Sequence, residues 1–253
     1  MSDFDRNVAA ARGGYATDRA LAIDAGLRAH MIRVYNYMAG AVALTGVVAW
    51  LTFSMATTTN AAGQLALTPL GQALFGSPLM WVLVLAPLAL VFFISFRIDR
   101  LQFGTAWTLF MVYAGLLGIS LATIFLVYTG NSITRVFFIT AASFGALSLY
   151  GYTTKRDLSA IGSFLIMGLI GIIIASLVNL FLQSTAMQFI ISVVGVLVFA
   201  GLTAWDTQKI KEMYDVNDDG TVAGRKAVMG ALTLYLDFIN LFLFLLRFLG
   251  DRR

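Results

Sequence analysis

The sequence predicts an all-α membrane protein, a bundle of seven transmembrane helices. Hydrophobic residues make up 59% of the 253 residues and charged residues only 12%, which is about half the charged fraction of soluble domains. The mean hydropathy is +0.85. The hydrophobic residues are gathered into seven runs near the ~20 residues that a helix needs to cross a bilayer, at positions 34–56, 79–96, 104–128, 133–150, 161–182, 186–205 and 227–246.

The polar lead before the first run predicts a short segment on one side of the membrane. Residues 1–33 mix Asp and Arg and contain no short apolar stretch followed by a small-residue cleavage site, so they do not have the form of a signal peptide. We therefore expect two parts, a polar cytoplasmic N-terminal segment over 1–33 and a seven-helix transmembrane domain over 34–253.

The basic residues predict the orientation of the chain. Thirteen of the seventeen Lys and Arg residues lie in the N-terminal segment or in the loops after the second, fourth and sixth runs, whereas the opposite loops contain only Arg135. This asymmetry places the N-terminus in the cytoplasm, and seven crossings place the C-terminus outside. Three basic residues near the C-terminus argue weakly against placing it outside: Arg247, Arg252 and Arg253. Six spans with a re-entrant last segment would bring them inside. The full length of the last run favours seven. The basic residues thus indicate topology rather than a nucleic-acid-binding surface.

The absence of cysteine limits the kinds of covalent bond, catalysis and metal site that the chain can form. It excludes disulfide bonds, thiol catalysis and thiolate metal sites. The single histidine, His30, argues against a His-rich transition-metal site and is interpreted as an interfacial polar residue. We therefore expect no cofactor.

A carboxylate lies within the last apolar run. Asp237 would cost roughly 2.5–3.5 kcal/mol at the centre of a lipid-facing helix, so a chain that retains it is expected to hide, pair or use it. It belongs to a polar stripe whose spacing of three, four and three residues keeps one helical face. The sequence therefore predicts that Asp237 points into the bundle, together with Gly230, Thr233 and Asn240.

A second acid, Asp206, follows the sixth run and shares a helical face with Thr203. Because the last two runs are consecutive, their helices are antiparallel. Asp237 lies about ten residues, or roughly 15 Å, into the last helix, so the two acids can meet in the cytoplasmic half of the membrane. Two carboxyl groups in contact titrate as a pair. The pair would be compact when it shares a proton and repulsive without one; the alternative is a purely structural polar pair.

Arg97, at the end of the second run, is the basic residue best placed to act on this pair. The alternative is a topology-setting arginine whose stem lies along apolar surface.

The stretch from Asp215 to Val222 matches the first half of an EF-hand loop, with Asp215, Asn217 and Asp219 at ligand positions. The twelfth position should be a bidentate Glu, and here it is Lys226. We interpret the stretch as a solvated acidic turn and expect no firm metal site.

Two stretches resemble the Bax inhibitor family, also called transmembrane Bax inhibitor motif proteins. They are TAWDTQKIK at 203–211 and ALTLYLDFINLFLFLLRFLG at 231–250. The resemblance implies a seven-helix bundle in a bacterial inner membrane, with the C-terminal helix at its centre. It also implies a pH-sensitive calcium leak channel in which an aspartate pair on the last two helices holds the pore closed. Asp206 and Asp237 match that pair within the two motifs.

In the same family an arginine at the end of the second helix interacts with the aspartates. Arg97 matches that residue by position, with Arg100 as the second choice. The resemblance therefore implies calcium ions and protons as the partners of this site, with the lipid bilayer as its surroundings.

The sequence leaves two other functions open. Some bacterial members of the family resemble non-conducting regulators of a membrane-bound ATP-dependent protease, which would bind the N-terminal segment. An intramembrane aspartyl protease would also carry two aspartates on these helices. However, the second acid lies in YLD rather than GxGD, and all three prolines precede the third run. We expect no enzymatic activity.

Overall fold

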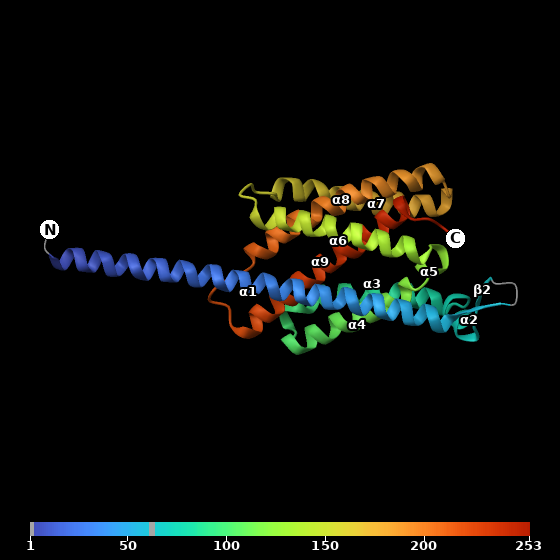
Figure 1. The fold of residues 1–253 in the computed structure, drawn as a ribbon, viewed down its shortest axis with the longest axis horizontal. Helices are drawn as coiled ribbons and strands as arrows, with labels where there is room; N and C mark the ends of the chain where they lie inside the picture. Colours follow the sequence, from blue (N-terminus) through green and yellow to red (C-terminus); the bar gives the residue numbers. More distant parts are fainter. Residues whose placement is uncertain (1–2, 61–63) are drawn as a thin grey trace.

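The computed structural model describes the backbone of residues 3–60 and 64–253 and the side chains of 23–60 and 64–253. Apart from a two-stranded antiparallel hairpin, the elements in this part are helical (Figure 1). In chain order they are α1 (Asp3–Ala56), β1 (Thr57–Thr59), β2 (Leu65–Leu67), α2 (Pro69–Phe75), α3 (Leu79–Arg97), η1 (Ile98–Arg100), α4 (Phe103–Leu121), α5 (Ile124–Val127), α6 (Gly130–Thr153), α7 (Ser159–Leu182), α8 (Thr185–Glu212) and α9 (Gly220–Leu249).

Seven of these helical segments are long and apolar enough to cross a membrane, which confirms the predicted number. Three helices, α6, α8 and α9, extend beyond the predicted runs at both ends, and α8 continues to Glu212 while α9 begins at Gly220. Hydropathy detects only the part of a helix that lies in hydrocarbon, whereas the polar turns at the ends keep helical hydrogen bonding. The alternative of six spans plus a re-entrant segment is wrong for this structure, because α9 is continuous.

The predicted boundary at residue 33 is not an element boundary. Helix α1 (Asp3–Ala56) continues through it without a break, and the division into an N-terminal segment and a transmembrane domain stays a prediction. The side chains of 1–22, most of the predicted N-terminal segment, lie outside the described residues.

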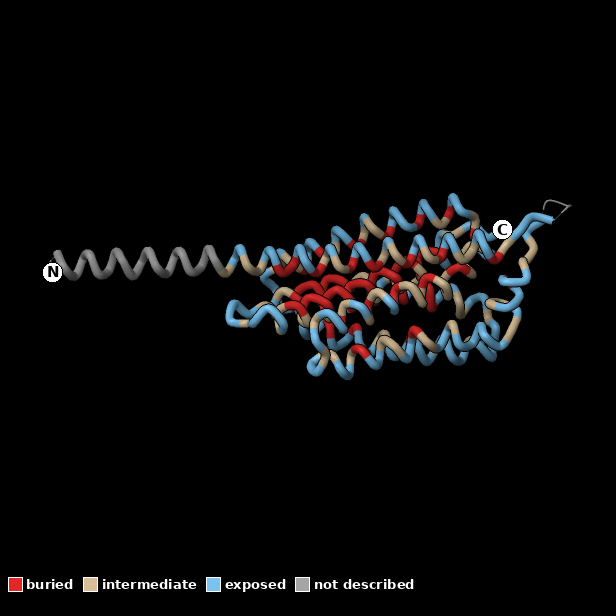
Figure 2. Tube along the Cα trace, turned by 90° about the horizontal axis from the view of Figure 1, so that it is seen from below, coloured by how far each residue is buried: buried red, intermediate tan, exposed pale blue. Residues whose placement is uncertain are grey.

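The C-terminal helix is the centre of the bundle. In Figure 1, α9 passes between α6, α7 and α8 on one side and α1, α3 and α4 on the other. It packs against α8, α1, α6 and α4, and 72% of its most apolar window is buried, against 11–33% for the other spans. Figure 2 shows the same contrast, with the buried residues gathered along the middle of the molecule. The outer helices bury one narrow side and leave the rest to lipid.

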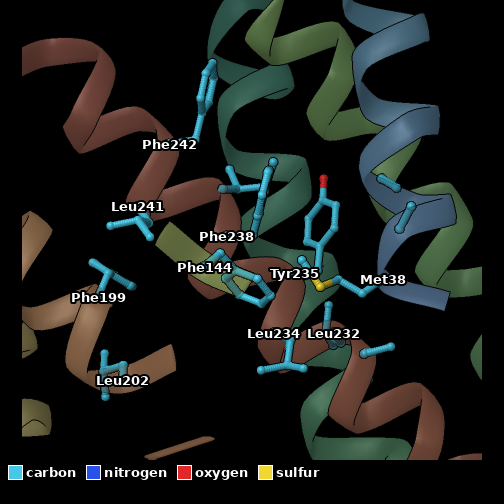
Figure 3. Close-up of a cluster of buried hydrophobic side chains, with 14 of the residues drawn as sticks. Met38, Phe144, Phe199, Leu202, Leu232, Leu234, Tyr235, Phe238, Leu241 and Phe242 are labelled. Carbon is cyan, nitrogen blue, oxygen red and sulfur yellow. The ribbon is translucent and has the colours of Figure 1, made fainter. Parts of the chain in front are cut away.

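Aromatic side chains around the middle of α9 form the apolar core (Figure 3). The ring of Phe238 lies edge-on to Phe144 of α6, with centroids 5.5 Å apart. The ring of Tyr235 lies edge-on to Phe110 of α4 at 5.6 Å. These edge-to-face contacts tie α9 to helices on both sides of the bundle.

Glycines allow α8 and α9 to approach closely. A Cβ atom on Gly230 would lie 3.0 Å from Ile210, and one on Gly195 would lie 2.5 Å from the ring of Phe244. These two contacts fix the antiparallel register of α8 against α9.

Candidate functional site

Asp206 and Asp237 both lie inside the bundle, on α8 and α9. Their exposed fractions are 8% and 4%, respectively. The helices that carry them, α8 and α9, pack against each other along their length. The structure therefore buries both acids on facing helices, and the pairing of their carboxyl groups stays a prediction.

One oxygen of Asp237 has no donor within reach. Oδ2 is buried and has no hydrogen-bond partner among residues 23–60 and 64–253. An unpaired buried polar atom costs about 1–3 kcal/mol, and an unpaired buried charge costs more. A neutral, protonated carboxyl group is therefore the less costly form at this position, unless a cation reaches the carboxylate.

A basic residue, Lys209, lies one helical turn after Asp206 on α8. Its ammonium group lies 5.2 Å from the centre of the Trp205 ring, and its side chain is exposed at the end of the bundle. Lys209 is thus the basic residue nearest to Asp206 along α8, on the side on which α8 ends.

Arg97 and Arg100 are not brought to the aspartates. Both side chains are exposed, and within the described part of the chain no ion pair or hydrogen bond joins either one to Asp206 or Asp237. The helix that carries Arg97, α3, packs chiefly against α4 rather than against α8 or α9. The expected contact of Arg97 with the pair is therefore absent from this structure.

The predicted supporting residues bond mainly to their own helices. Thr203, Thr233 and Asn240 each donate to the carbonyl four residues earlier, at 2.8, 3.0 and 2.8 Å. Thr203 is fully buried, whereas Thr233 and Asn240 are half-buried. Their donors are thus used locally, and their support of the aspartates stays a prediction.

A chain of hydroxyl groups reaches the residue next to Asp206, and spacing along one helix could not reveal it. The hydroxyl groups of Tyr35 and Ser148 are 2.5 Å apart, and those of Ser148 and Thr207 are 2.9 Å apart. Thr207 then donates to the carbonyl of Thr203 at 2.7 Å. Since α1, α6 and α8 supply one residue each, only the packed bundle brings them together. Tyr35 and Ser148 also line a cavity of about 530 Å³ between α1 and α6.

A second hydroxyl pair is buried in the bundle, between α9 and α1. The phenol of Tyr235 is 2.6 Å from the hydroxyl of Thr45, and Thr45 reaches the carbonyl of Ala114 at 2.9 Å. This links α9 to α1 and α4 through the apolar core. In Figure 3, the oxygen of Tyr235 points away from the rings of Phe144 and Phe238.

The acidic turn between α8 and α9 caps a helix. Asp219 is the N-cap of α9 and accepts from the backbone N–H groups of Thr221 and Val222 at 2.8 and 2.7 Å. Hydrogen bonding from the backbone of Asn217 lowers the pKa of Asp215. Lys226, at the position where a calcium loop needs Glu, forms an ion pair of 2.6 Å with Asp218. Among the described residues, no group of three or more His, Cys, Asp or Glu side chains is arranged to hold a metal ion.

The fold and the two buried aspartates define a multi-pass helical membrane protein with a polar site between its last two helices. Residues 27–253 match the family described as inhibitor of apoptosis-promoting Bax1, and the chain belongs to this family, the Bax inhibitor family.

Three relatives show how far the similarity extends. The chain is 48% identical over 232 residues to the inner membrane protein YbhL of Escherichia coli strain K12, covering 90% of this chain and 94% of YbhL. It is 49% identical over 237 residues to the protein RP147 of Rickettsia prowazekii, covering 94% and 95%. It is 44% identical over 260 residues to a protein of Caulobacter vibrioides, covering both chains in full.

Proposed function

We propose that this protein is a pH-sensitive cation leak channel of a bacterial inner membrane, with calcium as a permeant ion. The observation that carries the proposal is the burial of two aspartates, Asp206 and Asp237, on consecutive antiparallel helices that pack against each other. Membership in the Bax inhibitor family supports the assignment, because the resemblance of its two motifs implies this activity. YbhL, by its name an inner membrane protein, supports the location.

The proposed closed state is held by one proton between Asp206 and Asp237. With the proton, the two carboxyl groups are joined by a hydrogen bond between α8 and α9. Without it, two unit charges roughly 4 Å apart repel by about 4 kcal/mol at an effective dielectric constant of about 20. That energy shifts a two-state equilibrium by about a thousandfold. Loss of the proton therefore drives the two helices apart.

The surroundings of the pair agree with this role. Lys209, one helical turn after Asp206 on α8, is exposed at the bundle's end. Because no ion pair among residues 23–60 and 64–253 fixes the charge of either aspartate, a shared proton is what can join the two carboxyl groups. A divalent cation entering after deprotonation would meet two carboxylates.

Calcium flux into liposomes containing the purified protein tests the proposal. We expect flux through the unaltered protein to rise with pH as the pair loses its proton. Asp237→Asn and Asp206→Asn should each abolish that rise, because an amide carries no titratable proton. Asp157→Asn, an exposed acid in the turn between α6 and α7, is the matched control and should leave the pH profile unchanged. An unchanged profile in Asp237→Asn would overturn the proton latch.

The same liposomes separate the competing functions. Absence of flux at every pH, together with co-purification of a membrane-bound ATP-dependent protease, would favour a non-conducting regulator. We propose that the aspartates carry out no reaction. Peptide cleavage by the purified protein, lost in Asp206→Asn, would contradict that assignment.

A further inference from the structure

A pair of adjoining cavities lies at the end of the bundle opposite the aspartates. One has a volume of about 450 Å³ and the other about 400 Å³. Gln188, in the first turn of α8, and Arg247, in the last turn of α9, line both of them. The two cavities therefore form one hollow around Arg247, which we call the Arg247 hollow.

The lining of the Arg247 hollow has an apolar part and a polar part. The larger cavity is walled by α3 and α4, with Arg252 at its edge. Its wall residues Met80 and Val84 are about two-fifths exposed on the outer side of α3, so this cavity opens toward the acyl chains of the bilayer. The smaller cavity is lined by amide side chains, which can donate and accept hydrogen bonds, from Asn179, Gln183 and Gln188.

The positive charges of the hollow are not neutralised by the protein. Arg135, nearby, is paired with Asp251 at 3.0 Å. Arg247 lies over the ring of Phe244, 5.8 Å from its centre, and neither its guanidinium group nor that of Arg252 forms an ion pair or a hydrogen bond within 23–60 and 64–253. Two unpaired guanidinium groups thus face a hollow with an apolar wall.

We propose that the Arg247 hollow binds one anionic phospholipid. Its phosphate group would lie between Arg247 and Arg252, since guanidinium groups bind phosphate through two parallel hydrogen bonds. Its polar headgroup would contact the amides of Asn179, Gln183 and Gln188, and an acyl chain would lie along the wall formed by α3 and α4.

The occupant is a lipid rather than a soluble anion because the larger cavity opens through apolar residues of α3 and has an apolar wall. The proposal also explains a feature that topology leaves unexplained. In a seven-span protein with its N-terminus in the cytoplasm, Arg247, Arg252 and Arg253 lie on the side where basic residues are disfavoured. A bound anionic headgroup provides the counter-charge that two of them lack.

Native mass spectrometry of the full-length protein in detergent tests this proposal. The probes are phosphatidylglycerol, phosphatidylcholine with the same acyl chains, and glycerol 3-phosphate, which has the phosphate but no acyl chain. Each basic residue near an anionic lipid contributes a preference of roughly fivefold. We therefore expect the first phosphatidylglycerol to bind roughly tenfold or more tightly than phosphatidylcholine, and glycerol 3-phosphate not to displace it.

Two variants locate the site. Arg247→Gln/Arg252→Gln should bring the preference to about one. Lys155→Gln/Arg156→Gln, which removes two exposed basic residues at the opposite end of the bundle, should leave it unchanged. If the first variant does not fold, Arg252→Gln alone, beyond the end of α9, should still reduce the preference severalfold. The proposal is overturned by equal binding of the two lipids, by an equal loss of preference in the control, or by displacement by glycerol 3-phosphate.

Discussion

Neighbouring residues of the TAWDTQKIK stretch face three different partners. Asp206 is buried in the bundle, where α8 packs against α9. Thr207 contacts the hydroxyl of Ser148 on α6. Gln208 donates to the carbonyl of Arg156 at 2.8 Å and accepts from the backbone N–H of Leu158 at 2.9 Å. The end of α8 is therefore fixed to α9, to α6 and to the turn before α7. Any movement of α8 away from α9 must therefore break the contacts of Thr207 and Gln208, or move α6 and the turn before α7 together with α8.

The hydroxyl chain should contribute measurably to stability. Ser148→Ala removes its middle member and leaves the hydroxyl groups of Tyr35 and Thr207 without their shared partner. Hydrogen bonds between membrane helices contribute about 0.6 kcal/mol on average and up to about 1.7. We expect a loss near the upper value, because both neighbours lose a partner, measured as the free energy of unfolding in mixed detergent micelles. Ser163→Ala, an exposed serine that bonds to its own helix, is the control. Equal stability of the two variants would show that the chain is not a structural link.

Sequence reasoning identified the parts of the site that depend on one helix at a time. The spacing of Thr233, Asp237 and Asn240 predicted that Asp237 points into the bundle, where it is buried, and the consecutive order of α8 and α9 predicted that these helices are antiparallel neighbours, as they are. The contact of Tyr35, Ser148 and Thr207 could not be predicted, because three helices supply one residue each. Arg97 was placed by its position along the chain. Whether its helix packs against α8 or α9 is decided by tertiary packing, which the run lengths do not contain.

At the scale of whole helices, small residues decide how α6 and α8 meet. A Cβ atom on Gly151 would collide with the backbone of Ala204, including its carbonyl carbon at 2.9 Å. Backbone atoms cannot turn aside as a side chain can, so an added methyl group must push the two helices apart. Ala204 and Asp206 belong to the same stretch of α8, so the separation of these helices also sets the surroundings of the aspartates.

Gly151→Ala should therefore destabilise the protein by about 1–3 kcal/mol, the usual cost of overfilling a packed interior. Gly145→Ala makes the same change on the same helix where nothing lies within 4 Å of the added atom. It should be neutral or stabilising by up to about 1 kcal/mol, because alanine favours the helix. Thermal unfolding in detergent compares the two. If both variants unfold at the same temperature, the close approach of α6 to α8 is not a constraint on the fold.

At the scale of the whole molecule, the central position of α9 explains both the buried carboxyl group of Asp237 and the place of the positive charge of Arg247. Because α9 is surrounded by other helices, it can hold a carboxyl group without exposing it to lipid. The same helix ends in Arg247, at the opposite end of the bundle from the acidic turn that caps its start. The proposed proton latch and the Arg247 hollow thus use residues of the same central helix, Asp237 and Arg247, that are ten positions apart, and each can be altered without changing the residues of the other.

Seven crossings require the two termini to lie on opposite sides of the membrane, and Figure 1 places them at opposite ends of the molecule. With the N-terminus in the cytoplasm, Arg253 must face outward and the turn that contains Asp157 must face the cytoplasm. The chain has no cysteine, so a single introduced thiol reports one position without background. A membrane-impermeant maleimide applied to spheroplasts should label Arg253→Cys, and should label Asp157→Cys only after the membrane is opened. The reverse labelling pattern would show that the protein has the opposite orientation in the membrane. The basic residues around Arg247 would then follow the positive-inside rule, and the two aspartates would lie near the outer surface rather than near the cytoplasm.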